Sequence, residues 1–129
     1  MSFSDNAETL VLNWILDPLS SPTRPSATYL ALFTSNPDEG GTGTEVSTVG
    51  TAYARQAIAF TVSGNTASNT AAVEFPTATA SYGTVSHVGV YDASTGGNLI
   101  AYAALTTSKA IDTGDVLRVP AGDLDITLD

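Results

Sequence analysis

Apolar residues near the start of the chain recur at helical spacing and predict an amphipathic helix over about residues 4 to 17. The stripe consists of Ala7, Leu10, Val11, Trp14 and Ile15. Ser4 is placed to cap the start of this helix, and Asp17 precedes Pro18, which ends it. Two roles remain open for the stripe: it packs against the chain's own domain, or it docks on a neighbouring subunit.

The rest of the chain is patterned as short β-strands. The apolar run TYLALFT, residues 28 to 34, predicts a buried strand, and the polar, glycine-rich segment 35 to 50 predicts a long surface loop. From residue 53 to 62 the period is two, which places Tyr53 and Arg55 on the strand face opposite Phe60. Further strands are predicted in AAVEF, TVSHVGVYD, LIAYAAL, VLRVP and LDITLD.

Turn residues separate these strands. Gly96-Gly97 predicts a hairpin turn, Gly122 a turn into the last strand, and Phe75-Pro76 a strand end. In the last strand, alternation points Leu124, Ile126 and Leu128 inward and the intervening acids outward. About seven short strands with one helix predict a single all-β domain over residues 1–129: an antiparallel β-sandwich, jelly-roll-like, with the helix at its start.

The acidic composition narrows the possible partners. The 129 residues carry 13 acidic and 4 basic side chains, a formal net charge of -9, and no two bases are adjacent. Nucleic acids and anionic membrane surfaces are therefore not expected as partners. The chain has no cysteine, which excludes disulfides and thiolate metal sites. The N-terminus lacks a basic region, so we expect no signal peptide, and no apolar run approaches the roughly 18 residues of a membrane span.

Reactive side chains are sparse. His87 is the one imidazole, and no serine stands in a nucleophile motif, so we interpret His87 as a structural or interface residue rather than a catalytic base. Acids gather near the C-terminus at Asp112, Asp115, Asp123, Asp125 and Asp129. Their spacing matches no calcium loop, and alternation places most of them on a solvated face. A calcium site and a pair of glycosidase carboxylates are the weaker alternatives.

Four segments occur in a fixed order between residues 28 and 129: TYLALFTSNPDEGGTGTEVS, YARQAIAF, ASNTAAVEFPTATASYGTVSHVGVYDASTGGNLIAYAALT and GDVLRVPAGDLDITLD. In this order they resemble a family of small structural proteins of tailed bacteriophages. Its members are labelled tail-fibre or minor tail proteins, and some are similar to capsid decoration (cement) proteins. The resemblance implies an all-β virion protein, assembled in the bacterial host cytoplasm, with no catalytic residues, cofactor or metal.

Within that resemblance we expect a self-associating protein, a homotrimer, that binds the major capsid protein or tail proteins. The expected interface residues are Leu10, Trp14, Tyr53, Arg55, His87 and Tyr91. Arg55 is expected to pair with an acid at a subunit boundary or to remain solvated.

A compact domain without fibre repeats favours capsid decoration, and a tail or baseplate component is the alternative. A further hypothesis is binding of host carbohydrate through exposed Tyr82, Tyr91 and Tyr102, with Trp14 used up by the helix.

Overall fold

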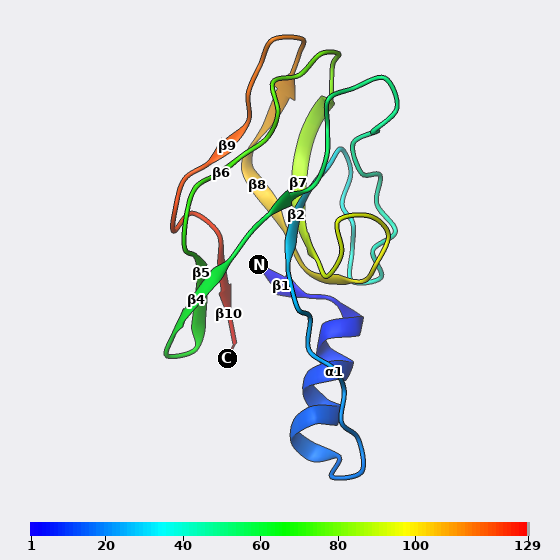
Figure 1. Cartoon of the computed structure of the whole chain (residues 1–129), viewed down its shortest axis with the longest axis vertical. Helices are drawn as coiled ribbons and strands as arrows, with labels where there is room; N and C mark the ends of the chain where they lie inside the picture. The colour runs from blue at the N-terminus through cyan, green and yellow to red at the C-terminus, as the bar shows by residue number, and fades with distance from the viewer. Residues whose placement is uncertain (129) are drawn as a thin grey trace.

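Antiparallel strands make up most of the ordered structure in the computed structural model, which describes residues 1–128 (Figure 1). Within that range the one helix follows a two-residue strand at the N-terminus, and the fold is all-β and sandwich-like, as predicted. The elements are β1 (Ser2–Phe3), α1 (Asp5–Leu16), β2 (Tyr29–Phe33), β3 (Gln56–Ala57), β4 (Phe60–Ser63), β5 (Thr66–Asn69), β6 (Val73–Glu74), β7 (Gly83–Tyr91), β8 (Leu99–Ile111), β9 (Arg118–Val119) and β10 (Asp125–Thr127).

The strands form one large sheet and two small ones. The large sheet has the order β1-β8-β7-β2-β3, and the small sheets are β10-β5-β4 and β6-β9. The small sheets lie across the β7–β8 side of the large sheet (Figure 1). The main apolar core joins the large sheet to the segments of both small sheets. It includes Leu30, Leu32, Phe75, Val85, Val88, Val90, Leu117, Val119 and Leu124.

Strand β7 departs from strict alternation because its pairing with β8 shifts register between Val85 and His87. Such a bulge inserts one residue and moves the following side chains to the other face. Val85 therefore shares the main core with Val88 and Val90. Strict alternation along TVSHVGVYD would place Val85 on the face of His87, and the register shift is the reason why that prediction is wrong.

The opposite face of the large sheet carries a smaller apolar cluster. It contains Ala31, Phe33, Tyr91 and Leu99. The rings of Phe33 and Tyr91 stack with their centroids 6.2 Å apart. Gly41 lies against Leu99 and the Tyr91 hydroxyl, so segment 35–50 helps to cover this cluster. Pro37 and Val46 in that segment are buried, which corrects the prediction of a plain surface loop.

The predicted strand over residues 53 to 62 is divided in two. β3 pairs with β2 in the large sheet, whereas β4 pairs with β5 in a small one. The chain thus crosses between sheets at residues 58–59, and the phase of its side chains changes there. Tyr53 and Ile58 are both buried, although alternation placed them on opposite faces.

The predicted turns are confirmed by the backbone. Gly96 and Gly97 have φ of 60° and 72°, in the left-handed region that glycine enters without steric cost. In the last strand, Leu124 and Ile126 are buried as predicted, but Leu128 is 49% exposed. Leu128 lies just beyond the pairing of β10 with β5, so no second layer covers it. Asp129 lies outside the described residues.

Candidate functional site

Helix α1 is fixed at its start and free along most of its length. Ser4 caps it by accepting a hydrogen bond from the Ala7 amide at 3.2 Å, as predicted. The Ser4 hydroxyl also donates to the Leu99 carbonyl, and its amide donates to the Ile100 carbonyl at 2.8 Å. These bonds attach the first turn to β8, and the helix then extends beyond the sheets (Figure 1).

We call residues 4–28, which comprise α1 and the segment that returns to β2, the α1 lobe. In α1 only Ala7 is buried. Towards the end of the helix apolar side chains point in all directions, and Trp14 and Leu16 are 70% and 71% exposed. Leu19, in the turn that follows, is 95% exposed. The prediction that Trp14 packs with the helix, and so is not available at the surface, is therefore wrong.

Two hollows flank the helix. One, of about 440 Å³, lies between α1 and segment 22–25 and is lined by Leu10, Val11, Trp14, Pro22, Pro25 and Ile100. The other, of about 600 Å³, lies on the side towards the C-terminal strand and includes Leu12 and Leu128 in its lining. Leu10, a predicted interface residue, is half-buried at the edge of the first hollow. The helix thus exposes apolar side chains and has a hollow on each of two sides.

Three of the other predicted residues meet in one cluster inside the chain. The Arg55 Nε and Nη2 donate to the two Glu45 carboxylate oxygens, both at 2.8 Å. The Tyr53 hydroxyl donates to Glu45 Oε1 at 2.7 Å, and the Arg55 guanidinium lies 3.7 Å from the centroid of the Tyr91 ring. The side chains of Arg55 and Glu45 are 8% and 27% exposed. Arg55 therefore neither remains solvated nor depends on another subunit for its acid.

The remaining bonds of this cluster connect loops to the sheet. Arg55 Nη1 donates to the carbonyls of Ala93 and Gly96 at 3.0 and 2.7 Å, which fixes the β7–β8 connection. The Tyr53 hydroxyl accepts the Leu32 amide at 3.1 Å. We call Glu45, Tyr53, Arg55 and Tyr91 the Arg55 clamp. With the bonds to Leu32, Ala93 and Gly96 it joins three parts of the chain: β2, segment 45–55 and the connection from β7 to β8.

Electrostatics in the clamp favour the charged pair. Burial alone would raise the pKa of Glu45, but hydrogen bonds from Arg55 and Tyr53 and the charge of Arg55 lower it overall. Burial and the hydrogen bond to Glu45 hold the pKa of Tyr53 well above its usual range. The clamp is therefore a neutral phenol bound to an ion pair across a wide pH range, which suits a structural role.

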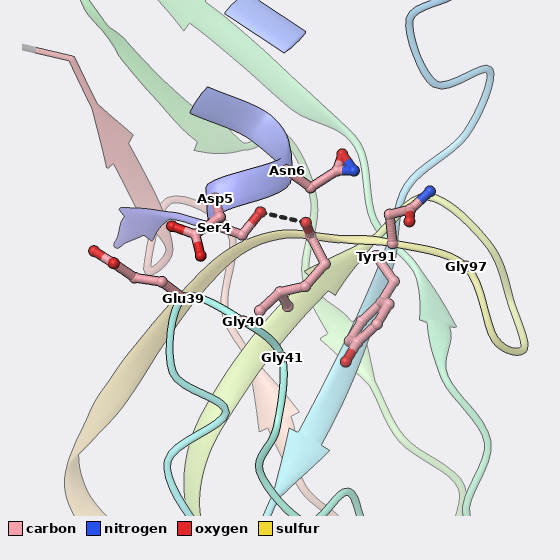
Figure 2. A pocket seen from close by; sticks show the side chains of 10 residues that line it. Ser4, Asp5, Asn6, Glu39, Gly40, Gly41, Tyr91 and Gly97 are labelled. Atoms are coloured by element: carbon pink, nitrogen blue, oxygen red, sulfur yellow. Dashed lines mark hydrogen bonds between the residues drawn. The ribbon is translucent and has the colours of Figure 1, made fainter. Parts of the chain in front are cut away.

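A polar hollow of about 290 Å³ lies at the start of α1 (Figure 2). Figure 2 shows Asp5 and Glu39 on one side of it and Tyr91 on the other. The Ser4 hydroxyl is already bonded to the Leu99 carbonyl and the Ala7 amide. Among residues 1–128, no group of three or more His, Cys, Asp or Glu side chains has the geometry to hold a metal ion.

His87 stands apart from the other predicted residues. It is half-buried on β7, and its Nδ1 lies 2.8 Å from the Ser86 hydroxyl. In the described part of the chain no carboxylate bonds to its ring, so the orienting acid of a catalytic triad is missing there. The tyrosines proposed for sugar binding are mostly unavailable: Tyr82 and Tyr91 are buried, and only Tyr102 is partly exposed.

Sequence reasoning missed Glu45 and Leu19. Glu45 lies in a polar segment that resembles any loop, and no short-range pattern links it to Arg55, ten residues later. Leu19 follows Pro18 outside the helical stripe, although an isolated leucine between prolines and serines was a usable signal.

Comparison with known proteins identifies a family for this chain. The model of the family "Podophage GP4 fiber I protein gp80" matches residues 2–127, almost the whole chain. No curated protein matches the chain significantly. No helix in residues 1–128 is long and apolar enough to cross a membrane. Because the family model covers almost the whole chain, the chain belongs to the podophage GP4 fiber I protein gp80 family of phage structural proteins.

Proposed function

We propose that the protein is a non-enzymatic structural component of the phage tail that forms or joins a fibre. The match of residues 2–127 to a fibre protein family carries this proposal. The same match supports the tail alternative better than capsid decoration, which the compact, repeat-free sequence had favoured.

The structure contains features that suit such a role. The sandwich-like body is rich in small, unreactive side chains, and the ion pair between Arg55 and Glu45 holds loops together. Among residues 1–128, no buried side-chain nitrogen or oxygen lacks a hydrogen-bond partner. A body of this kind resists local opening, because each opening would break satisfied bonds. The net charge of -9 keeps free copies soluble before assembly.

Assembly is the second part of the proposal. We expect the copies to associate with one another, as a homotrimer, and the assembly to contact other tail proteins. Closed cyclic symmetry is the usual way in which identical subunits form strong contacts. The apolar α1 lobe is the surface on this chain best suited to such contacts, because its large side chains are exposed.

Localisation on the intact particle tests the proposed function. We would label purified phage with antibodies raised against the protein and image it by electron microscopy, and would place the chain in cryo-EM density of the tail. Label confined to the tail is the expected result. A regular lattice of label over the head would favour the capsid-decoration hypothesis instead, and particles without label would refute a virion role.

The non-enzymatic part has a separate test. Phage carrying His87→Ala should assemble and infect as the parent does, since His87 is the one imidazole in the chain. Loss of infection by well-assembled His87→Ala particles would contradict this part of the proposal.

A further inference from the structure

We propose that copies of this chain bind one another through the α1 lobe, with the apolar side chains of one lobe seated against the lobe of the next copy. The proposal deepens the proposed fibre role and rests on it, because a fibre requires several chains to associate. It names a surface and an occupant: the occupant is a second copy of this chain.

The distal half of the lobe exposes large apolar side chains on several sides. Leu12, Ile15 and Leu16 lie on one side of α1, at helical spacing, and are 57%, 63% and 71% exposed. Trp14, on another side of the helix, and Leu19, in the turn that follows, are 70% and 95% exposed. A helix that is apolar on all sides is normally buried, so the distal half of α1 requires a cover.

The charge distribution favours another copy as the cover. Residues 9–28 contain one acid, Asp17, and one base, Arg24, and so are neutral. The remainder of the chain carries the other 12 acids and 3 bases and holds the entire formal charge of -9. Two copies repel one another wherever their acidic bodies meet. The whole lobe also includes Asp5 and Glu8 at its base, so two copies approach with least repulsion through the neutral part of their lobes, residues 9–28, with the bodies held apart.

The lobe carries both projecting side chains and a groove. Trp14 lines the 440 Å³ groove between α1 and Pro22–Pro25, whereas the exposed Leu12 borders the hollow on the other side of the helix. That groove is large enough for one or two bulky side chains of a neighbour. Asp17 and Arg24 are both exposed, and within residues 1–128 neither forms an ion pair. In a symmetric contact, Asp17 of one copy is available to Arg24 of another.

Association of the purified full-length protein tests the proposal. We would measure mass by sedimentation velocity and light scattering over a dilution series. Ile15→Glu and Leu19→Glu each place a charge at an exposed position of the lobe. Because both side chains are exposed, neither substitution disturbs the core of the protomer. Each should weaken association by about 30-fold or more, the loss typical of a central interface residue. Val49→Glu is the matched control, because Val49 is an 85% exposed aliphatic side chain outside the lobe.

Charge exchange between separate chains tests the direct contact. Asp17→Arg and Arg24→Asp should each weaken self-association by about threefold, because like charges then face one another. Mixing the two variants should restore association, since each arginine again meets an aspartate on another copy. Restoration on mixing excludes repair within one chain. Far-UV circular dichroism and thermal unfolding confirm that every variant is folded.

The outcomes separate this inference from the proposed function. A wild-type protein that stays monomeric at all concentrations, or lobe variants that associate as well as Val49→Glu, would overturn the inference. Either result would leave tail localisation untouched, and the lobe would then face a different tail protein. Label on the head of the particle would overturn the proposed function even if the lobes associate.

Discussion

Removing the guanidinium of the Arg55 clamp is the most informative perturbation of the fold. Arg55→Met keeps an unbranched apolar stem and deletes two bonds to Glu45, two bonds to backbone carbonyls and the contact with the Tyr91 ring. Breaking a buried ion pair costs about 3–5 kcal/mol. Glu45 is 27% exposed and keeps its bond from Tyr53, so we expect the lower end, about 3 kcal/mol of unfolding free energy.

The assay is urea unfolding followed by far-UV circular dichroism. Tryptophan fluorescence is unsuitable, because Trp14 is 70% exposed in the lobe and senses the sheets weakly. A loss of about 3 kcal/mol should also lower Tm by about 10 °C. Arg118→Met, which removes an exposed guanidinium from β9, is the control and should cost less than about 0.5 kcal/mol. Equal effects of the two variants would refute the structural role of the clamp.

The interaction energy between Arg55 and Glu45, and its dependence on pH, can be measured separately. In a double-mutant cycle, Arg55→Met and Glu45→Gln should couple by more than about 1 kcal/mol. The pKa of Glu45 is lowered below its usual 4.5 on folding, so its contribution is complete above that pH and is lost as pH falls through the folded pKa. Stability should therefore decline between about pH 5 and about pH 3 more steeply in the wild type than in Glu45→Gln. Parallel declines would contradict the assigned pair.

Three further predictions address the body of the fold. Asn69→Ala should lower the free energy of unfolding by about 3 kcal/mol, because the buried Asn69 side chain forms three hydrogen bonds to backbone groups. Asn65→Ala is the control and should lower it by less than about 1 kcal/mol, because Asn65 forms one exposed hydrogen bond. Urea unfolding of both variants measures the difference. Gly43→Ala should cost about 2 kcal/mol or more, since its Cβ would meet backbone atoms at 2.6 Å, while Gly40→Ala, with no contact under 3.6 Å, is nearly neutral in Tm. The pKa of Tyr53 is raised on folding, so this tyrosine stabilises the fold fully below about pH 10, and that contribution is lost as pH rises through the folded pKa. Burial also raises the pKa of Tyr82, Tyr91 and Tyr102, but by less, so in an alkaline absorbance titration Tyr53 should be the last tyrosine to ionise and Tyr53→Phe should remove that last step.

Local signals in the sequence predicted local structure well. The helix was placed at residues 4 to 17, and α1 spans Asp5–Leu16 with Ser4 as its cap, because capping and helix termination depend on residues within one turn. The glycine turn at 96–97 followed from the same kind of short-range chemistry. The position of strand β7 was also predicted. Which of its side chains share a face was not, because the bulge depends on how β7 pairs with β8.

Long-range contacts were beyond the reach of these patterns. Tyr53, Arg55 and Tyr91 were expected at a subunit interface, and their cluster with Glu45 inside the chain was not predicted. Pairing of Arg55 with Glu45 is decided by how segment 35–50 folds over β2. The same folding buries Tyr91, which removes it from a sugar-binding surface. Exposure of Trp14 was missed for a related reason: a helical stripe shows that a face is apolar, but not whether the chain supplies anything to cover it.

The attachment of α1 to β8 sets an order of events during synthesis. The lobe leaves the ribosome before its anchor, because Leu99 lies 95 residues after Ser4. Translation at about 5–20 residues per second separates the two by several seconds. During that interval the apolar helix has neither its anchor strand nor a finished body beneath it. Chains on neighbouring ribosomes of one messenger are then the nearest partners, and lobes that bind one another would bring nascent subunits together before their sheets close.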